Sequence, residues 1–124
     1  MPVQGPQYKF QRLQVYRLAL AYVDSVYEVA SQLPDSERYN LQSQVQRAAT
    51  SIALNIAEGS TGQSDPEQHR FLGMALRSYL ETIACWDLAE RREYLGAEAL
   101  RDVRDAGHGL FVKLQAMRRS LAKD

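Results

Sequence analysis

Helical periodicity is the sequence feature that most constrains the fold. Apolar residues recur every three or four positions along almost the whole chain, and the alternation of apolar and polar residues typical of a half-buried strand is missing. This spacing brings apolar side chains onto one face of a helix, so the sequence predicts an all-α fold. A chain of 124 residues can bury one core but not two. We therefore expect one domain over residues 1–124, with a flexible N-terminal segment at residues 1–9.

Proline and glycine divide the periodic pattern. The first helix is expected over about residues 13–33, because Pro34 cannot continue a helix and restricts the residue before it. The second helix is expected over about residues 37–58. Gly59 can end it in the left-handed conformation, and the small residues that follow indicate a turn.

The third helix is expected over about residues 64–94. It opens with Ser-Asp-Pro-Glu, in which either of the first two side chains can cap the helix and the proline fits its first turn. Gly96 then separates it from a fourth helix over about residues 97–121, which is weakest at Gly107 and Gly109. Connections this short favour antiparallel neighbours, so we expect an antiparallel up-and-down four-helix bundle.

The charges of the chain are balanced and evenly spread. Fifteen Lys and Arg residues offset fifteen Asp and Glu residues, with five of each sign up to residue 62 and ten of each after it. Non-specific binding of nucleic acid depends on a clustered excess of cations, which the chain as a whole lacks. The balance therefore disfavours such binding, although it leaves room for a local basic patch.

Two features indicate a cytoplasmic protein. Cys85 is the only cysteine, so no intrachain disulfide can form, as expected in a reducing compartment. No uncharged run approaches the roughly 20 apolar residues that span a bilayer, and residues 1–7 lack the layout of a secretion signal. We therefore predict a cytoplasmic location and no membrane association.

Two helices carry more apolar surface than a solitary bundle uses. The apolar arc of residues 13–33 covers about 200° of the helical wheel, whereas a monomeric bundle needs little more than about 100°. Between Tyr39 and Ala57 the second helix has one charged residue, Arg47, although a solvent-facing helix is normally rich in Lys and Glu. Contiguous exposed apolar surface typically marks an interface, so subunit contact is favoured over a generously apolar core with exposed edges.

A polar stripe runs beside the apolar face of the second helix. If the second and third helices are antiparallel about the turn at 59–66, residues whose numbers sum to about 125 lie level with each other. This alignment pairs the stripe with polar residues of the third helix and suggests an ion pair between Arg47 and Glu81. A buried network that fixes helix register is favoured over a ligand site, so replacing Arg47 with Ala is expected to lower stability sharply. The predicted network comprises Gln44, Arg47, Ser51, Asn55, Glu58, Arg70, Ser78 and Glu81.

No residue pattern points to catalysis. Glycine-rich phosphate loops and nucleophile elbows are missing from the sequence, and Gly59-x-x-Gly62 is better explained as a turn. A di-iron bundle needs paired Glu-x-x-His motifs, whereas Asp105-x-x-His108 is the only spacing of that kind, so His108 is interpreted as a surface residue. Cys85 has no activating neighbour and is interpreted as a buried, inert thiol. We therefore predict no enzymatic activity, no metal and no cofactor.

Basic residues gather toward the C-terminal half of the chain. Acidic residues interleave with them, so a solvated face laced with salt bridges is favoured over a strip that binds RNA. The alternative strip would use Arg91, Arg92, Arg101, Arg104, Arg118 and Arg119.

Motifs in the second and third helices resemble those of a known family. The residues that carry the resemblance are Arg47-Ala48-Ala49, Ser51-Ile52, Asn55-Ile56-Ala57-Glu58-Gly59, Phe71-Leu72, Ala75, Ser78 and Glu81. They resemble the signature of bacterial four-helix bundle proteins encoded in intervening sequences of large-subunit ribosomal RNA genes. A more distant resemblance is to the accessory variability determinant of diversity-generating retroelements. The similarity covers nearly the whole chain, from about Phe10 to Leu95.

The resemblance implies an up-and-down bundle in a ring-like homo-oligomer, expected to be a pentamer, with no known catalysis. The chain departs from the family pattern at Arg77, where glycine is usual, and just after Glu81, where Thr82 and Ile83 stand in place of a common acidic residue. It also lacks the strong positive charge of the retroelement relatives, which bind nucleic acid or a reverse transcriptase. The first functional hypothesis is a non-enzymatic scaffold that presents a surface to a protein partner. The alternative is a nucleic-acid-binding accessory factor that uses arginines arrayed around a ring.

Overall fold

The computed structural model describes residue 5 and residues 7–62 and 64–122. Within this part the chain forms helices and no strand, which confirms the predicted all-α class. The helices are α1 (Gln14–Ala30), α2 (Leu41–Gly59), α3 (Asp65–Arg91) and α4 (Ala97–Leu121), with short 3-10 helices η1 (Lys9–Arg12) before α1 and η2 (Asp35–Glu37) before α2. Residues 1–4 and 6 of the predicted N-terminal segment lie outside the described residues.

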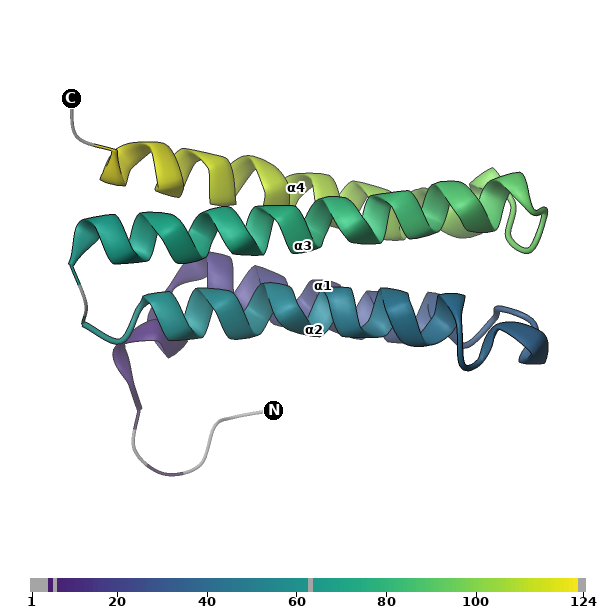
Figure 1. The fold of residues 1–124 in the computed structure, drawn as a ribbon, viewed down its shortest axis with the longest axis horizontal. Coiled ribbons are helices and arrows are strands. Elements are labelled where there is room, and N and C mark those ends of the chain that lie inside the picture. The colour runs from purple at the N-terminus through teal and green to yellow at the C-terminus, as the bar shows by residue number, and fades with distance from the viewer. Residues whose placement is uncertain (1–4, 6, 63, 123–124) are drawn as a thin grey trace.

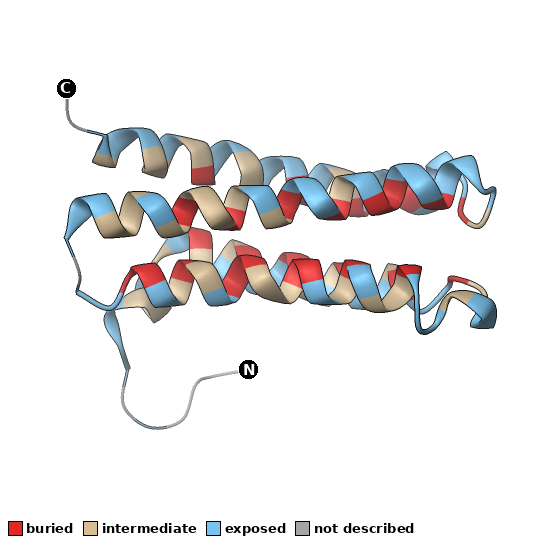
Figure 2. Ribbon diagram, in the orientation of Figure 1, coloured by how far each residue is buried: buried red, intermediate tan, exposed pale blue. Residues whose placement is uncertain are grey.

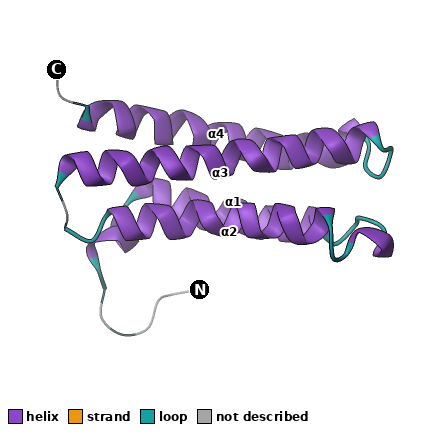
Figure 3. Cartoon of the chain, in the orientation of Figure 1, coloured by secondary structure: helices purple, strands orange, loops and turns teal. Residues whose placement is uncertain are grey.

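The four helices form an up-and-down bundle (Figure 1). Each α-helix runs antiparallel to the next, so α1 begins at the same end of the bundle at which α4 finishes. Contacts join α1 to α2, α2 to α3, α3 to α4 and α4 back to α1, whereas the backbones of diagonal helices stay apart within the described residues (Figure 3). Short connections therefore produce the arrangement that the sequence predicts.

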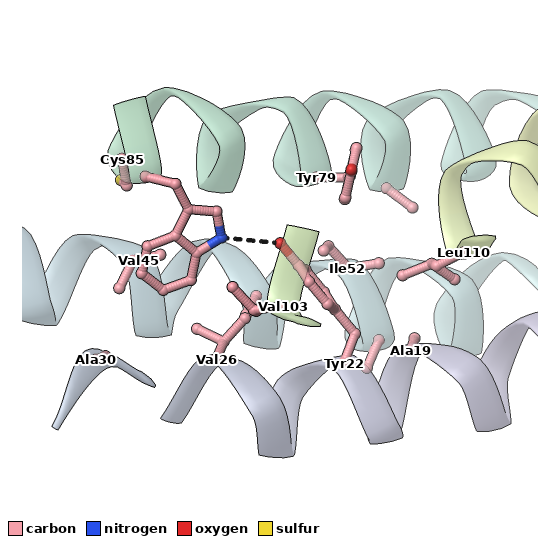
Figure 4. Packing of buried hydrophobic residues seen from close by; sticks show 14 of the residues in the cluster. Ala19, Tyr22, Val26, Ala30, Val45, Ile52, Tyr79, Cys85, Val103 and Leu110 are labelled. Carbon is pink, nitrogen blue, oxygen red and sulfur yellow. Dashed lines mark hydrogen bonds between the residues drawn. The ribbon is translucent and has the colours of Figure 1, made fainter. Parts of the chain in front are cut away.

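A chain of hydrogen bonds links α1 to α3 through the centre of the core. Figure 4 marks one of them, at the hydroxyl of Tyr22. The hydroxyl oxygens of Tyr22 and Thr82 lie 2.7 Å apart, and Trp86 Nε1 donates to the Tyr22 hydroxyl at 3.3 Å. The Thr82 hydroxyl donates in turn to the carbonyl oxygen of Tyr79 at 2.6 Å. Burial raises the pKa of both tyrosines, that of Tyr79 to about 12. Because these buried polar groups have partners, they fix how α1 faces α3 without the cost of an unpaired donor.

Gly107 lets α4 approach this cluster. A Cβ atom at this position would lie 2.8 Å from Cε1 of Tyr22 and 2.8 Å from Cε1 of Tyr79, which is too close for a side chain. α4 runs unbroken through the position at which the sequence predicts its weakest point. The glycine weakens the helix locally, but the absence of a side chain is what admits the two rings.

The start of α2 differs from the prediction. The helix was expected from about residue 37, but Asp35–Glu37 forms a 3-10 turn and α2 begins at Leu41. The Glu37 carboxylate accepts hydrogen bonds from the Leu41 N–H at 3.1 Å and from Asn40 Nδ2 at 2.9 Å. Glu37 thus satisfies a free amide at the beginning of α2 instead of lying inside the helix.

The ends of α1 and α3 also lie before the predicted ones. α1 ends at Ala30, three residues short of the expected limit. α3 begins as expected, because the Ser64 hydroxyl accepts from the Glu67 N–H and Pro66 lies in the first turn. It ends at Arg91, and Glu93 adopts the left-handed conformation with a φ of 60°.

Gly59 has a different role from the predicted left-handed cap. It is the last residue of α2, and among the described glycines only Gly5 and Gly62 have positive φ. A Cβ atom at Gly59 would lie 2.4 Å from the Cβ of Phe71, so the glycine allows α2 to approach the first turns of α3. Close helix contact, and not backbone conformation, requires a glycine here.

Candidate interaction surface on helices α2 and α3

Helix α2 is the most thoroughly covered of the four helices. Only four of its 19 residues are exposed, namely Gln44, Arg47, Leu54 and Glu58. Its core side chains include Val45, Ile52 and Ile56, each without measurable exposure. Helix α2 carries two charged residues, so few groups on its outer side favour contact with water. Figure 2 shows the burial of its residues.

The outward sides of α2 and α3 expose three leucines. Leu54 on α2 is 61% exposed, and Leu80 and Leu88 on α3 are 52% and 54% exposed. Leu80, Ala84 and Leu88 follow one another at four-residue intervals, so they form one stripe along α3. These leucines were not among the predicted interface residues, although the spacing of the stripe is visible in the sequence. An apolar stripe of this kind typically marks a contact with another molecule.

A polar groove lies between α2 and α3. The hydroxyl oxygens of Ser51 and Ser78 are 2.9 Å apart, and Asn55 Nδ2 donates to the Ser51 carbonyl at 2.9 Å and to the Ser51 hydroxyl at 3.0 Å. The three side chains are half-buried and line an open depression of about 460 Å³ together with Met74, Arg77 and Glu81. We call the leucine stripe, Leu54 and this groove the α2–α3 surface.

The structure brings together only part of the predicted polar network. Ser51, Asn55 and Ser78 are connected, whereas Gln44, Arg47, Glu58 and Glu81 are exposed. The predicted ion pair between Arg47 and Glu81 is wrong, because the described residues contain no ion pair or hydrogen bond between them. Both charges stay in water, where an isolated ion pair gains little.

The main partner of Arg70 lies on its own helix and not in the polar stripe of α2. Arg70 Nη2 lies 2.7 Å from Glu67 Oε1 on the same helix. Hydrogen bonding to Glu67 and the charge of Glu67 raise the pKa of Arg70, and the charge of Glu58 adds to this effect. The helix register also differs from the predicted one: Ser51 meets Ser78 and Gly59 meets Phe71, so level residues sum to 129 or 130 instead of about 125. This difference amounts to about one helical turn.

The six arginines of the alternative nucleic-acid strip do not form one patch. Because α3 and α4 are antiparallel, Arg91, Arg92, Arg101 and Arg104 lie toward the connection between the two helices, and Arg118 and Arg119 lie toward the opposite end (Figure 1). Arg104 Nη2 lies 3.1 Å from Asp87 Oδ1 and 3.1 Å from Glu90 Oε1. The Arg92 guanidinium lies 5.9 Å from the centre of the Tyr94 ring. At the connection, one of the four arginines therefore pairs with acidic residues, as expected of a solvated face.

Cys85 and His108 occupy ordinary positions. Cys85 is buried, and burial followed by the charge of Glu81 raises the pKa of its thiol to about 11, so the thiol is protonated at neutral pH. His108 is exposed, with its ring 6.4 Å from that of Phe111. The described part of the chain holds no group of three or more His, Cys, Asp or Glu residues placed to bind a metal ion.

A search of the helices for a membrane span is negative. Within the described residues, none of them combines the length and apolar character needed to cross a bilayer. The cytoplasmic location stays a prediction.

Several of the residues that carry the family resemblance lie in contacts between α2 and α3. Ser51, Asn55 and Ser78 form the groove, and Gly59 and Phe71 form the close contact at the end of α2. Their side chains therefore define how α2 and α3 fit together. The contact between the two helices accounts for these five residues of the motif.

Comparison with known proteins agrees with this motif. The chain shares its fold with the crystal structure of a protein of unknown function from the S23 ribosomal protein family of Bacteroides thetaiotaomicron VPI-5482. The two are 23% identical over 84% of this chain and 97% of that one, with a TM-score of 0.77. No curated protein matches the sequence significantly. The family model of the 23S rRNA-intervening sequence proteins matches residues 11–115, so the chain belongs to that family.

Proposed function

We propose that this protein is a non-enzymatic, homo-oligomeric interaction module that acts as a scaffold for a protein partner. The observation that carries the proposal is the α2–α3 surface, where Leu54, Leu80 and Leu88 are each more than half exposed. Burying one leucine side chain contributes about 1.5–3 kcal/mol, so covering the three of them favours association. Because the neighbouring helix α2 carries few charges, covering it adds little desolvation cost to the free energy of association.

A second apolar surface on α1 favours a ring. Leu20 and Tyr27 are 44% and 46% exposed, and α1 lies diagonally across the bundle from α3. Contact between two different surfaces of successive copies is heterologous, and it closes into a ring when the rotation divides a full turn. The pentamer that the family resemblance implies requires a rotation of about 72° per copy.

Gel filtration with light scattering tests the assembly. The wild-type protein is expected at about 70 kDa, five times the mass of the 14.1 kDa chain. Leu88→Glu is expected to shift the mass toward that of one chain, because the contact would bury an unpaired charge. Val112→Glu on α4 is the matched control, since Val112 is 47% exposed and lies outside the α2–α3 surface. A wild-type monomer at micromolar concentration would contradict the proposal.

A nucleic-acid-binding accessory factor is the second candidate function. The observation that favours it is that Arg118 and Arg119 make no ion pair with a carboxylate within the described residues. Repetition of these arginines around a ring would build a positive field that the neutral chain lacks. If nucleic acid stays bound to the purified protein and the binding weakens as the salt concentration rises, the result supports this candidate. Binding that does not change with salt concentration argues against it.

A further inference from the structure

An open depression on α3 is rich in arginine. It has a volume of about 460 Å³, and α4 contributes one arginine to its wall. Three guanidinium groups and no carboxylate are among its lining residues, which are Arg70, Gly73, Met74, Leu76, Arg77, Leu80 and Arg118. In a chain whose charges sum to zero, such a local excess of cations predicts an anionic ligand.

Arg118 is held in place by the backbone of α3. Its Nε donates to the carbonyl oxygen of His69 at 3.1 Å. Its guanidinium lies against Gly73, where a Cβ atom would come within 2.8 Å of Nη2 and 3.0 Å of Cζ. Glycine weakens the interior of a helix relative to alanine, and here it makes room for the guanidinium. The two Nη atoms have no acceptor within the described residues, so they are available to an external anion.

Arg70 and Arg77 lie two turns apart on α3. Arg70 is oriented by its bonds to Glu67, and its guanidinium carbon lies 4.6 Å from the centre of the Phe71 ring. Arg77 is exposed and has no hydrogen bond or ion pair in the described structure. Glu67 forms the ion pair with Arg70 and the charge of Glu58 also acts on it, whereas Arg77 and Arg118 have no ion pair in the described structure.

We propose that the depression binds the oxyanion of a phosphate group. Guanidinium groups present planar pairs of N–H donors that match phosphate oxygens, and three of them provide more donors than one carboxylate can accept. The apolar side chains of Met74 and Leu80 would then contact an uncharged part of the ligand. Two sources share this chemistry, a free phosphate compound and the phosphodiester backbone of nucleic acid. All of the lining residues come from one chain, but Met74, Arg77 and Leu80 also belong to the α2–α3 surface, so the Leu88→Glu variant tests the site without a covering copy.

Two titrations of the full-length protein test the site and distinguish the sources. Calorimetry measures binding of inorganic phosphate, and fluorescence anisotropy measures binding of a short, labelled single-stranded RNA. Arg118→Gln and Arg77→Gln are each expected to weaken binding about tenfold, because each removes charge-assisted hydrogen bonds. Arg38→Gln is the matched control, since Arg38 is exposed, lies outside the depression and the alternative arginine strip, and has no ion pair in the described structure. It is expected to leave both affinities within about twofold of wild type.

Each outcome decides the proposal. Binding of inorganic phosphate alone identifies free phosphate compounds as the ligands, and binding of the RNA identifies a phosphodiester backbone. The proposal is overturned if neither probe binds, or if Arg38→Gln weakens binding as much as Arg118→Gln does. Leu88→Glu leaves the lining residues unchanged and is expected to bind at least as tightly as wild type, so failure of the assembly and failure of this site can be told apart.

Gly73→Ala separates a binding role of Arg118 from a purely structural one. The added methyl group displaces the guanidinium, so phosphate affinity is expected to fall several-fold. The thermal midpoint is not expected to fall with it, because alanine favours the helix. If Arg118 only ties α4 to α3, Gly73→Ala and Arg118→Gln would lower the thermal midpoint and leave phosphate affinity unchanged. That result would overturn the proposal.

Discussion

Helices α2 and α4 belong to one bundle but face different surroundings. Four of the 19 residues of α2 are exposed, whereas 14 of the 25 residues of α4 are. α2 carries two charged residues and α4 carries eight. One exposed residue of α2 is a leucine, and α3 continues the apolar surface beside it, while the exposed residues of α4 are mostly charged or small.

The difference supports the proposed position of a second copy of the chain. The charged residues on the outer side of α4 are favourably solvated, so that side gains no stability from contact with another molecule. The outer side of α2 has few charges and adjoins the polar groove. Covering the exposed leucines beside it with another molecule lowers the free energy of the system. The bundle therefore has one side suited to solvent and one side suited to contact.

A core substitution in α2 is expected to have the largest effect. Ile52 is fully buried, so Ile52→Ala is expected to lower the free energy of unfolding by about 2–5 kcal/mol, through lost burial and a cavity. Urea denaturation measures the change. Val112→Ala on the exposed side of α4 is expected to change it by less than about 0.5 kcal/mol. Equal effects of the two substitutions would remove the distinction between the helices.

Two glycines of α4 separate its core side from its solvent side. Gly107→Ala is expected to cost about 1–3 kcal/mol, because the methyl group would overlap the rings of Tyr22 and Tyr79. Gly109→Ala adds the same methyl group in open space and is expected to stabilise the protein by up to about 1 kcal/mol. Thermal unfolding of the pair measures the opposite signs. Destabilisation by both variants would show that α4 does not tolerate a side chain on either side.

Removal of Arg47 is expected to have little effect on one chain. Arg47 is exposed and has no ion pair in the described structure, so Arg47→Ala in the Leu88→Glu background is expected to change the free energy of unfolding by less than about 0.5 kcal/mol. This corrects the sharp loss of stability that the sequence suggests. Urea denaturation measures this free energy of unfolding, and a loss above about 2 kcal/mol would show that Arg47 belongs to a structural network.

The beginning of α2 makes a small, pH-dependent contribution. The hydrogen bond from the Leu41 N–H, followed by that from the Tyr94 hydroxyl, lowers the pKa of Glu37 below its usual value of 4.5. A lowered pKa in the folded state stabilises the protein above pH 4.5, and this contribution is lost as pH falls through the folded value. Glu37→Gln is expected to make the loss of stability in acid shallower. Urea denaturation at several pH values tests this, and parallel curves for the two proteins would contradict it.

Local signals in the sequence located most helices. Pro34 and Gly96 mark breaks where the structure has connections, and Ser64 and Pro66 open α3 as expected. The start of α2 was misplaced, because Glu37 caps Leu41 from outside the helix and a glutamate in an apolar pattern looks the same inside a helix. Such side-chain contacts across a turn produce no periodic pattern of apolar residues in the sequence.

Contacts between helices were harder to predict than the helices. The polar stripe of α2 was expected to face α3, and Ser51 and Ser78 of the predicted network do contact each other, although the predicted register placed Ser78 level with Arg47. The register was wrong by about one turn, since it depends on Gly59 lying against Phe71 and not on the length of the turn alone. The arginine depression joins residues of two helices that are far apart in sequence, so no local motif could reveal it.

Cysteine labelling of the assembled protein tests the account most directly. Leu88 and Val112 are similarly exposed in one chain, at 54% and 47%, and the native Cys85 is buried with a raised pKa, so it reacts slowly. The account predicts that a maleimide reagent labels the Val112→Cys protein quickly and the Leu88→Cys protein many times more slowly, because a second copy covers the α2–α3 surface. Equally fast labelling of both variants, at a concentration where light scattering finds the wild-type mass, would contradict it.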